Sequence, residues 1–287
     1  MPATQNRTSI FLSLGPHSGI ISQKMKNRLL HLPERDEKPR EHGITMVMDK
    51  GLSTRQAEDL VSSAGRYIDF IKLGFGTSLV SNNVAEKVKI YHEGECKVYL
   101  GGTLFEAFVA RNAFEDYMRL LDEWKLDCVE VSDGSLTMHE DQKCGYIRRL
   151  AEHRLVLSEV GSKEEGILIS PNKWLTMMQA ELQAGSWKVI TEARESGTVG
   201  IYRPNGSAHT LLVKKIIKHI DIKDIIWEAP QKAQQVWFIN LLGANVNLGN
   251  IAPDEVIALE TTRLGLRGDT FYNFLPPELA NKLSTHS

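Results

Sequence analysis

From Gly43 onward the sequence repeats one pattern, in which a short apolar run is followed by a longer stretch with apolar residues at helical spacing. This alternation is typical of βα units, whose strands pair in parallel within one sheet. Eight such runs occur, at residues 45–49, 69–73, 97–101, 128–132, 156–160, 188–192, 224–228 and 245–249. A doubly wound sheet rarely contains eight consecutive, evenly spaced units without a glycine-rich nucleotide-binding fingerprint. We therefore predict an α/β fold of the (β/α)8 TIM barrel type.

The chain has 287 residues, a length that fits either one barrel or two smaller domains. The first 38 residues show no sustained period, and Pro33 and Pro39 flank a charged run. We predict a single domain with an N-terminal extension: residues 1–38 form the extension, 39–275 the barrel and 276–287 a C-terminal tail.

Several helices carry start and stop signals. Ser170 precedes a proline and Gly185 follows the helical pattern, which predicts an N-cap and a C-terminal glycine. By the same signals, further helices are expected over residues 53–65, 81–94 and 254–264. An apolar stripe over residues 114–124 is expected to pack on the barrel, with a subunit interface as the alternative.

Composition excludes some partners. Lys and Arg total 34 and Asp and Glu total 36, so a net charge of −2 gives no basic field for nucleic acid. No stretch approaches the roughly 20 apolar residues that would cross a membrane. Cys96, Cys128 and Cys144 lack CxxC spacing and are expected to be free thiols. We predict a cytoplasmic protein with neither a nucleic acid nor a membrane as partner.

Four successive predicted strands each carry a glutamate near their end: Glu130, Glu159, Glu192 and Glu228. The carboxyl ends of barrel strands form the active-site face, so these side chains are expected to form one ring. Carboxylates that converge away from water need a cation. Oxygen ligands without nearby His or Cys favour Mg²⁺, and Asp49 and Asp133 are further candidate ligands.

Basic residues lie at or just past the same strand ends: Lys50, Lys72, Lys163 and Arg194. A mouth that mixes acids and bases suits a small polyanion bridged by a metal ion. The alternative is a purely internal layer of salt bridges across the barrel mouth.

The region after the seventh and eighth strands is where this fold often binds phosphate. Backbone amides near Gly249 and Asn250, with Arg267 behind them, are candidates for such a site. Alternatively, Arg263 and Arg267, four residues apart, only solvate a helix end. The glycine cluster at residues 74–79 has a leucine where a dinucleotide loop has its third glycine, which argues against dinucleotide binding.

The sequence resembles the phosphosulfolactate synthase family from about Pro39 to Thr270. The resemblance rests on residues 49–52, 72–78, 101–106, 131–134, 158–163, 191–197, 228–232 and 265–270. It implies a (β/α)8 barrel that adds sulfite to phosphoenolpyruvate in the presence of Mg²⁺, giving (2R)-phospho-3-sulfolactate. It also hints at a homo-oligomer.

Residue roles follow from this resemblance. Lys163 matches the family's proposed general acid, and Lys50, Lys72, Arg194 and Arg267 are expected to hold phosphate, carboxylate and sulfite. Ser132 and Gly268 lie in matching segments and are assigned to substrate binding. A plant heat-stress-associated branch, a protein-protection factor and not a synthase, resembles the same family, so a non-catalytic relative is one alternative. Another phosphoenolpyruvate-type or aldolase-like lyase is the other. The opposed charges at the strand ends favour the synthase.

Overall fold

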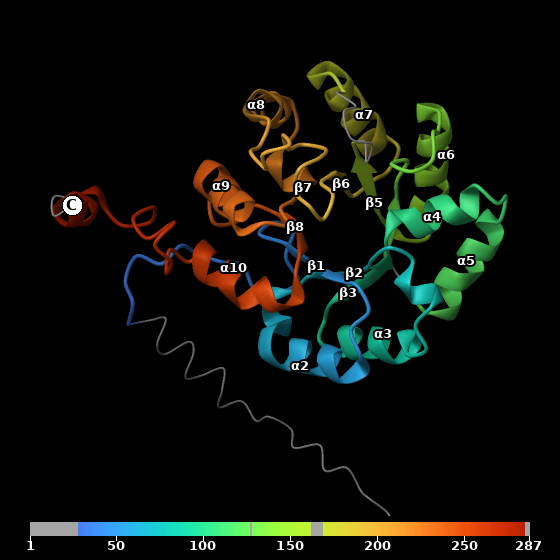
Figure 1. Cartoon of the computed structure of the whole chain (residues 1–287), viewed down its shortest axis with the longest axis horizontal. Coiled ribbons are helices and arrows are strands. Elements are labelled where there is room, and N and C mark those ends of the chain that lie inside the picture. The colour runs from blue at the N-terminus through green and yellow to red at the C-terminus, as the bar shows by residue number, and fades with distance from the viewer. Residues whose placement is uncertain (1–27, 127, 162–168, 285–287) are drawn as a thin grey trace, which may run out of the picture.

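A computed structural model of the chain describes residues 28–126, 128–161 and 169–284. Eight parallel strands form a nearly closed barrel surrounded by helices (Figure 1). The strands are β1 (Thr45–Asp49), β2 (Phe70–Leu73), β3 (Lys97–Leu100), β4 (Cys128–Val131), β5 (Leu155–Val160), β6 (Lys188–Thr191), β7 (Ile225–Glu228) and β8 (Leu248–Ile251). Their order is β3-β2-β1-β8-β7-β6-β5-β4, and β3 lies next to β4, so the predicted (β/α)8 barrel is confirmed.

The helices that surround the barrel alternate with the strands along the chain. They are α2 (Thr54–Ala64), α3 (Val84–Glu93), α4 (Gly102–Val109), α5 (Phe114–Glu123), α6 (Glu140–Ala151), α7 (Pro171–Gln183), α8 (Thr210–His219), α9 (Lys232–Leu242), α10 (Val256–Arg263) and α11 (Pro277–Ser284). Short 3₁₀ turns cover Gly65–Tyr67, Thr77–Leu79, Ile222–Asp224 and Pro253–Glu255. No helix in the described part of the chain has both the length and the apolar character that a membrane span needs.

The predicted caps hold for two helices and fail for a third. The Ser53 and Ser170 side chains accept hydrogen bonds from the first turns of α2 and α7, as predicted. Helix α3, in contrast, starts three residues after Ser81. The Ser81 hydroxyl donates instead to the Thr77 carbonyl oxygen, 2.8 Å away, because a 3₁₀ turn occupies this part of the loop.

The last strand also lies later in the sequence than predicted. We expected it over residues 245–249, but β8 runs from Leu248 to Ile251. The preceding residues form a turn in which the Val246 amide donates to the Gly243 carbonyl oxygen. Gly243 has a φ of +91°, so the chain becomes extended only after this turn is complete.

Because side chains alternate between the two faces of each strand, the barrel has two apolar layers. One fills the barrel interior and consists of Ile44, Met46, Phe70, Tyr99, Cys128, Leu157, Ile190 and Ile226. The other lies between strands and helices and includes Phe114, Tyr117 and Leu121 of α5, so the predicted stripe packs in the core. Residues two positions beyond the interior layer, at the carboxyl ends of the strands, point into the mouth of the barrel.

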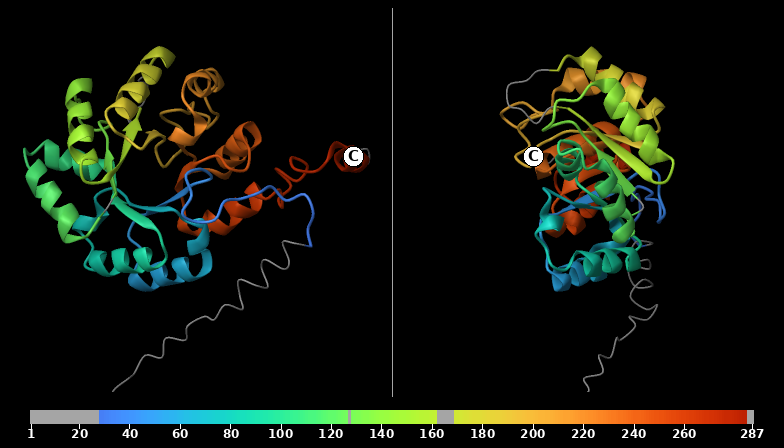
Figure 2. Two further views of the ribbon diagram at one scale, coloured as in Figure 1. Left: turned by 180° about the vertical axis from the view of Figure 1, so that it is seen from behind. Right: turned by 90° about the vertical axis from the view of Figure 1, so that its right-hand side faces the viewer.

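The amino ends of the strands are closed by the N-terminal segment. Figure 2 (right) shows the first described residues, in blue, on the side of the barrel opposite to the loop that follows β6. There Arg35 pairs with Glu260 of α10 at 3.1 Å, and Arg40 pairs with Asp69 at 2.9 Å. Helix α11 projects beyond α10, away from the barrel (Figures 1 and 2).

Candidate active site

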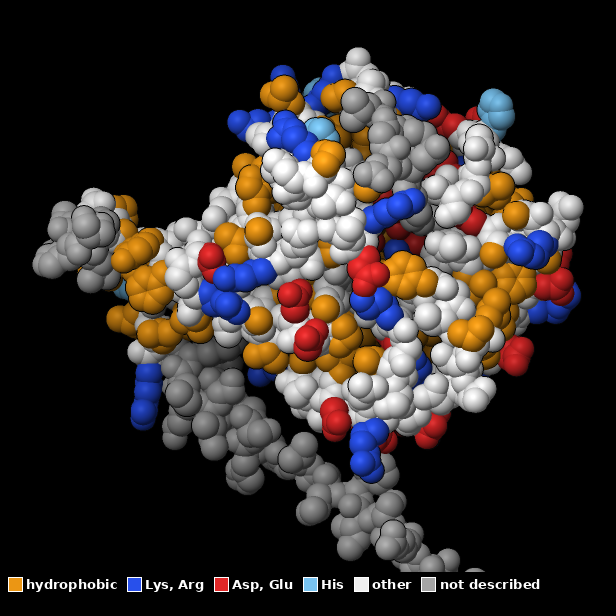
Figure 3. Space-filling model, viewed as in Figure 1, with side chains coloured by type: hydrophobic (Ala, Val, Ile, Leu, Met, Phe, Trp, Pro, Cys, Tyr) orange, Lys and Arg blue, Asp and Glu red, His pale blue; other side chains and the backbone are white. Residues whose placement is uncertain are grey.

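A cavity of about 390 Å³ opens at the carboxyl ends of the strands. Acidic and basic side chains surround a hollow on this face of the molecule (Figure 3). The lining residues that the structure describes are Met48, Lys72, Phe75, Gly101, Gly102, Thr103, Glu130, Ser135, Glu159, Glu192, Ala193, Arg194, Glu195, Ser196, Glu228 and Asn250. The cavity therefore collects seven of the sequence-predicted site residues: Lys72, Glu130, Glu159, Glu192, Arg194, Glu228 and Asn250.

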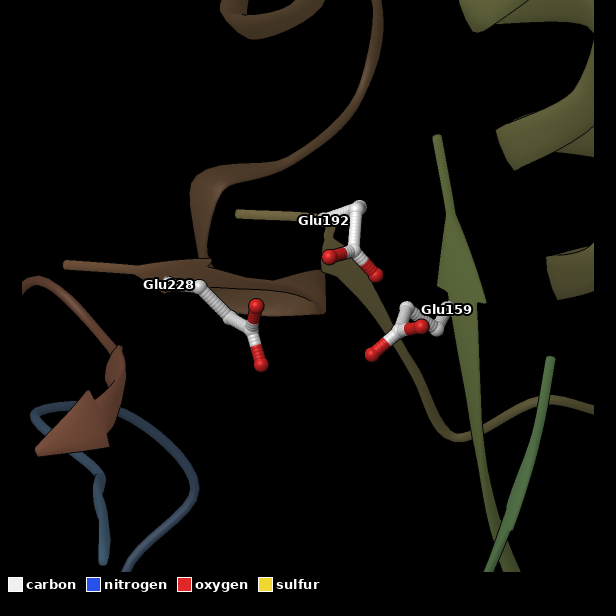
Figure 4. Close-up of side chains that lie close together, drawn as sticks. All are labelled: Glu159, Glu192 and Glu228. Atoms are coloured by element: carbon white, nitrogen blue, oxygen red, sulfur yellow. The ribbon is translucent and has the colours of Figure 1, made fainter. Parts of the chain in front are cut away.

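Three of the glutamates converge within the cavity. One carboxylate oxygen each from Glu159, Glu192 and Glu228 lies within 4.8 Å of the others, and all three residues are buried (Figure 4). Glu159 lies in β5, Glu192 directly follows β6 and Glu228 ends β7, so all three lie at the carboxyl ends of neighbouring strands. The register pairs Glu159 with Ile190, two residues before Glu192 and on the same face of the strand. Hard carboxylate oxygens are the donors that Mg²⁺ prefers, so this set fits such an ion.

Lys72 of β2 places a positive charge against the same carboxylates. Its Nζ lies 2.9 Å from Glu130 Oε2, 3.1 Å from Glu159 Oε2 and 3.4 Å from Glu228 Oε1. Burial alone lowers the pKa of this ammonium, but the glutamates outweigh it and hold the pKa well above its usual range. Lys72 therefore provides a permanent positive charge.

Glu228 shows how crowded the negative charges are. Burial, reinforced by neighbouring Glu159, raises the pKa of Glu228 to about 7, although Lys72 and the Ala193 amide act in the opposite direction. That amide donates to Glu228 Oε2 at 2.9 Å. A divalent cation at the cluster would favour the ionised form of this carboxylate.

Glu130 is fixed by the turn after β3. The Gly102 amide donates to Glu130 Oε1 at 2.5 Å. A Cβ at Gly102 would approach the Ser132 Oγ to 2.1 Å, so this close approach requires glycine. The Ser132 hydroxyl itself donates to Glu106, and Ser132 is buried outside the cavity lining, where it supports the site without facing a substrate.

Exposed charges form the rim of the cavity. Lys50, after β1, makes an ion pair with Glu195, after β6, and so links two loops across the mouth. Arg194 lines the cavity beside this pair. Asn250 is held below the rim, where its Nδ2 donates to the Ala193 carbonyl oxygen at 3.0 Å.

Asp49 does not join the glutamates, contrary to the prediction that it ligates the metal. It shares the outward orientation of Val47, which packs between the strands and the helices. Its carboxylate accepts hydrogen bonds from the Gly51 and Leu52 amides at 2.8 and 2.7 Å, and from Lys87 and Tyr91 of α3 at 2.6 and 2.9 Å. Asp49 thus holds the turn that carries Lys50.

The predicted phosphate cradle is not assembled around the cavity. Arg267 and Gly268 do not line it, and a Cβ at buried Gly249 would meet Met46 and Ile226 inside the barrel. Arg263 is buried beneath the barrel and donates to the carbonyl oxygens of residues 44, 244 and 246, so it does not merely solvate a helix end. Lys163 lies outside the described residues.

Several residues at the site were not predicted from the sequence. Met48 and Gly101 follow the interior residues Met46 and Tyr99 by two positions, so strand alternation could have found them. Phe75 and Ser135 lie in loops, where no periodic signal exists. Lys143 of α6 reaches the strands from outside and donates to the Glu159 carbonyl oxygen at 2.6 Å.

The fold and this cavity define a (β/α)8 barrel enzyme with an acidic active site at its mouth. The chain belongs to the family described as (2R)-phospho-3-sulfolactate synthase (ComA), whose model matches residues 33–269. It is 42% identical over 251 residues to a phosphosulfolactate synthase of Bacillus subtilis, which covers 86% of this chain and 100% of the relative. A phosphosulfolactate synthase of Methanothermobacter thermautotrophicus is 42% identical over 244 residues, covering 83% and 95% of the two chains.

Two more distant similarities complete the comparison. Protein HEAT-STRESS-ASSOCIATED 32 of Arabidopsis thaliana is 23% identical over 261 residues, covering 80% of this chain and 88% of the relative. Among solved structures, the carboxyl transferase domain of Rhizobium etli pyruvate carboxylase with pyruvate and biocytin aligns with a TM-score of 0.52 at 15% identity, covering 86% and 47% of the two chains. The latter shows the shared barrel fold alone.

Proposed function

We propose that the chain adds sulfite to phosphoenolpyruvate, with Mg²⁺ as cofactor, to give (2R)-phospho-3-sulfolactate. One observation carries the proposal: three buried glutamates converge beside a lysine in a cavity whose rim carries Lys50 and Arg194. Such a site suits a compact polyanion that is bound together with a cation. Membership of the synthase family supports the same reaction over the heat-stress alternative, whose relative shares only 23% identity.

In this proposal Glu159, Glu192 and Glu228 hold the metal, because they supply a carboxylate oxygen each within 4.8 Å. Bound Mg²⁺ would supply positive charge that stabilises the negative charge developing on the substrate carboxylate. Lys72 stays protonated and balances part of the charge of Glu130, Glu159 and Glu228. A cation bound at the cluster would favour the ionised form of Glu228, whose pKa burial raises to about 7.

The basic residues at the rim bind and orient the anions. Arg194 and Lys50 are assigned to phosphate, carboxylate and sulfite, since they lie at the mouth of the cavity. The sulfite sulfur forms a bond to C3, and the π electron pair of the C2–C3 double bond moves toward the carboxylate. A proton is then delivered to C2, and we assign this step to Lys163 on the family resemblance.

The proposal also includes a homo-oligomeric, cytoplasmic enzyme. The family resemblance supports the oligomer, and the free thiols Cys96, Cys128 and Cys144 are in keeping with a reducing compartment.

The test is incubation of the pure protein with phosphoenolpyruvate, sulfite and Mg²⁺, with the products followed by phosphorus NMR and mass spectrometry. We expect a sulfonated phosphoester that forms only when all three components are present. Where a glutamate of the cavity is substituted by glutamine, Glu58→Gln on the exposed face of α2 is the matched control. Unchanged phosphoenolpyruvate after prolonged incubation at any Mg²⁺ concentration would contradict the proposal.

A further inference from the structure

The turn that follows β2 contains an unusual residue for its backbone conformation. The Thr77 amide donates to the Gly74 carbonyl oxygen at 3.0 Å, which closes a four-residue turn. Both central residues have positive φ, +55° at Phe75 and +66° at Gly76, as in a type I′ turn. The first central position of such a turn favours Asn, Asp or Gly, and a bulky aromatic residue there is a conformational outlier.

Packing in the core does not explain why phenylalanine occupies this position. The Phe75 residue is 52% exposed, so burial offsets little of the strain of the left-handed conformation. A glycine or an asparagine would form the same turn with less strain. Neither core packing nor the turn therefore accounts for phenylalanine at this position.

The location of Phe75 indicates what the side chain does. Phe75 lines the cavity three residues after Lys72 on the same βα connection. The neighbouring wall is Met48, whose sulfur lies so near Gly74 that a Cβ on this glycine would approach it to 2.4 Å. Met48 and Phe75 are the large apolar side chains among the described lining residues, which otherwise are mostly charged, polar or small.

We propose that Phe75 is a specificity-determining residue that covers the apolar CH2=C group of the enolpyruvate substrate. This inference rests on the proposed function. Phosphoenolpyruvate is charged at its phosphate and carboxylate, and its methylene is the apolar part that sulfite must reach. An aromatic ring at the mouth limits the space around C3 and excludes water from the charged groups beneath it, which strengthens their interactions with the substrate.

The test compares Phe75→Gly, Phe75→Asn and Phe75→Leu with the wild type on two substrates, phosphoenolpyruvate and its analogue with a methyl group on C3. Gly and Asn suit the turn but remove the ring, whereas Leu keeps an apolar side chain. We expect Gly and Asn to leave Tm unchanged or raised and to lower kcat/KM for phosphoenolpyruvate about tenfold. The preference for phosphoenolpyruvate over the methyl analogue should fall about tenfold, the range for one methylene group in a pocket. Leu should lie between them and the wild type.

Phe271→Asn is the matched control, because Phe271 is 46% exposed and lies outside the cavity lining. It should change neither kcat/KM nor substrate preference. Wild-type kinetics and preference in Phe75→Asn would overturn the inference. So would a lower Tm with equal losses on both substrates, which is the result of a merely structural role. If the wild type consumes neither substrate, the proposed function fails first and the inference fails with it.

Discussion

The two ends of the barrel both bury charged side chains, but they balance them differently. At the amino end, Arg35 pairs with Glu260 and Arg40 with Asp69, while Arg263 donates to three backbone carbonyl oxygens. Each charge thus has a fixed partner within the chain. Burial lowers the pKa of Arg263 to about 9, which leaves it charged at neutral pH.

At the mouth, the buried charges that the structure describes in the cavity lining are four glutamates and one lysine: Glu130, Glu159, Glu192, Glu228 and Lys72. This excess of negative charge is a cost to the folded state, and a ligand cation offsets it. The amino end thus balances its buried charges with fixed partners, whereas at the mouth one buried lysine faces several buried glutamates and the net charge is negative. Substitutions at the two ends should therefore have opposite consequences.

The largest expected effect is at the mouth. Glu192→Gln keeps the side-chain shape but removes one of the converging negative charges. We expect kcat to fall by at least about 100-fold, because Glu192 is one of the three carboxylates proposed to hold the metal ion that stabilises charge in the transition state. Without metal, thermal unfolding should occur at the same or a higher temperature, since repulsion among the glutamates decreases.

Calorimetric titration with Mg²⁺ gives an independent readout for this variant, which should bind the ion more weakly than the wild type. Glu58→Gln serves again as the control. A variant with normal turnover and normal Mg²⁺ affinity would show that the glutamates form only an internal ion-pair layer.

The second effect is at the amino end. Arg263→Met removes one hydrogen-bond donor from each of three buried carbonyl oxygens and takes away a buried charge that interacts with Glu260, so the free energy of unfolding should fall by about 3–5 kcal/mol. Urea denaturation measures this loss. At low temperature, where the variant stays folded, its kcat should remain within about twofold of the wild-type value. A loss of kcat without a loss of stability would contradict the contrast between a structural amino end and a catalytic mouth.

A smaller effect concerns the pH dependence of stability. Burial raises the pKa of Glu260, but Arg35 outweighs it and the pKa lies below its ordinary 4.5. The folded state thus binds this proton less tightly than the unfolded state. The stabilisation is present above about pH 4.5 and is lost as the pH falls through the lower folded value.

Arg35→Met should remove about 1.5–3 kcal/mol at neutral pH, the range for hydrogen bonds to charged groups. It should also weaken the decline of stability toward acid pH. Urea denaturation at several pH values checks both expectations. Parallel curves for variant and wild type would assign the acid sensitivity to other carboxylates.

Much of the mouth could be predicted from the sequence, because side chains alternate regularly between the two faces of each strand. Glu130, Glu159, Glu192 and Glu228 each lie two positions beyond a residue of the barrel interior, so they share the interior face and the carboxyl end of the barrel. Asp49 was wrongly predicted to be a metal ligand, because its position at the end of a strand was taken as sufficient evidence that it faces the cavity. Asp49 is three residues beyond the interior residue Met46, and each step along a strand reverses the face, so its side chain lies on the outer face.

Other features depend on contacts between distant segments, which no local pattern encodes. Lys87 and Lys143 reach Asp49 and the Glu159 carbonyl oxygen from helices, at 2.6 Å in each case. In the sequence, these two lysines look like ordinary solvent-exposed residues. The placement of Arg263 under the barrel likewise follows from how α10 packs, and the spacing of four to Arg267 gave no indication of it.

The smallest effect on stability is expected at the rim, which is neither paired like the amino end nor buried like the cavity. Lys50 and Glu195 are 45% and 54% exposed in their side chains, so water screens their attraction. A double-mutant cycle with Lys50→Ala and Glu195→Ala should therefore give a coupling in unfolding free energy below about 0.5 kcal/mol. Lys50→Ala should nevertheless raise KM for phosphoenolpyruvate, because an anion at the mouth would use the same ammonium. A large stability coupling with unchanged KM would place this pair with the structural charges of the amino end and not with the binding surface.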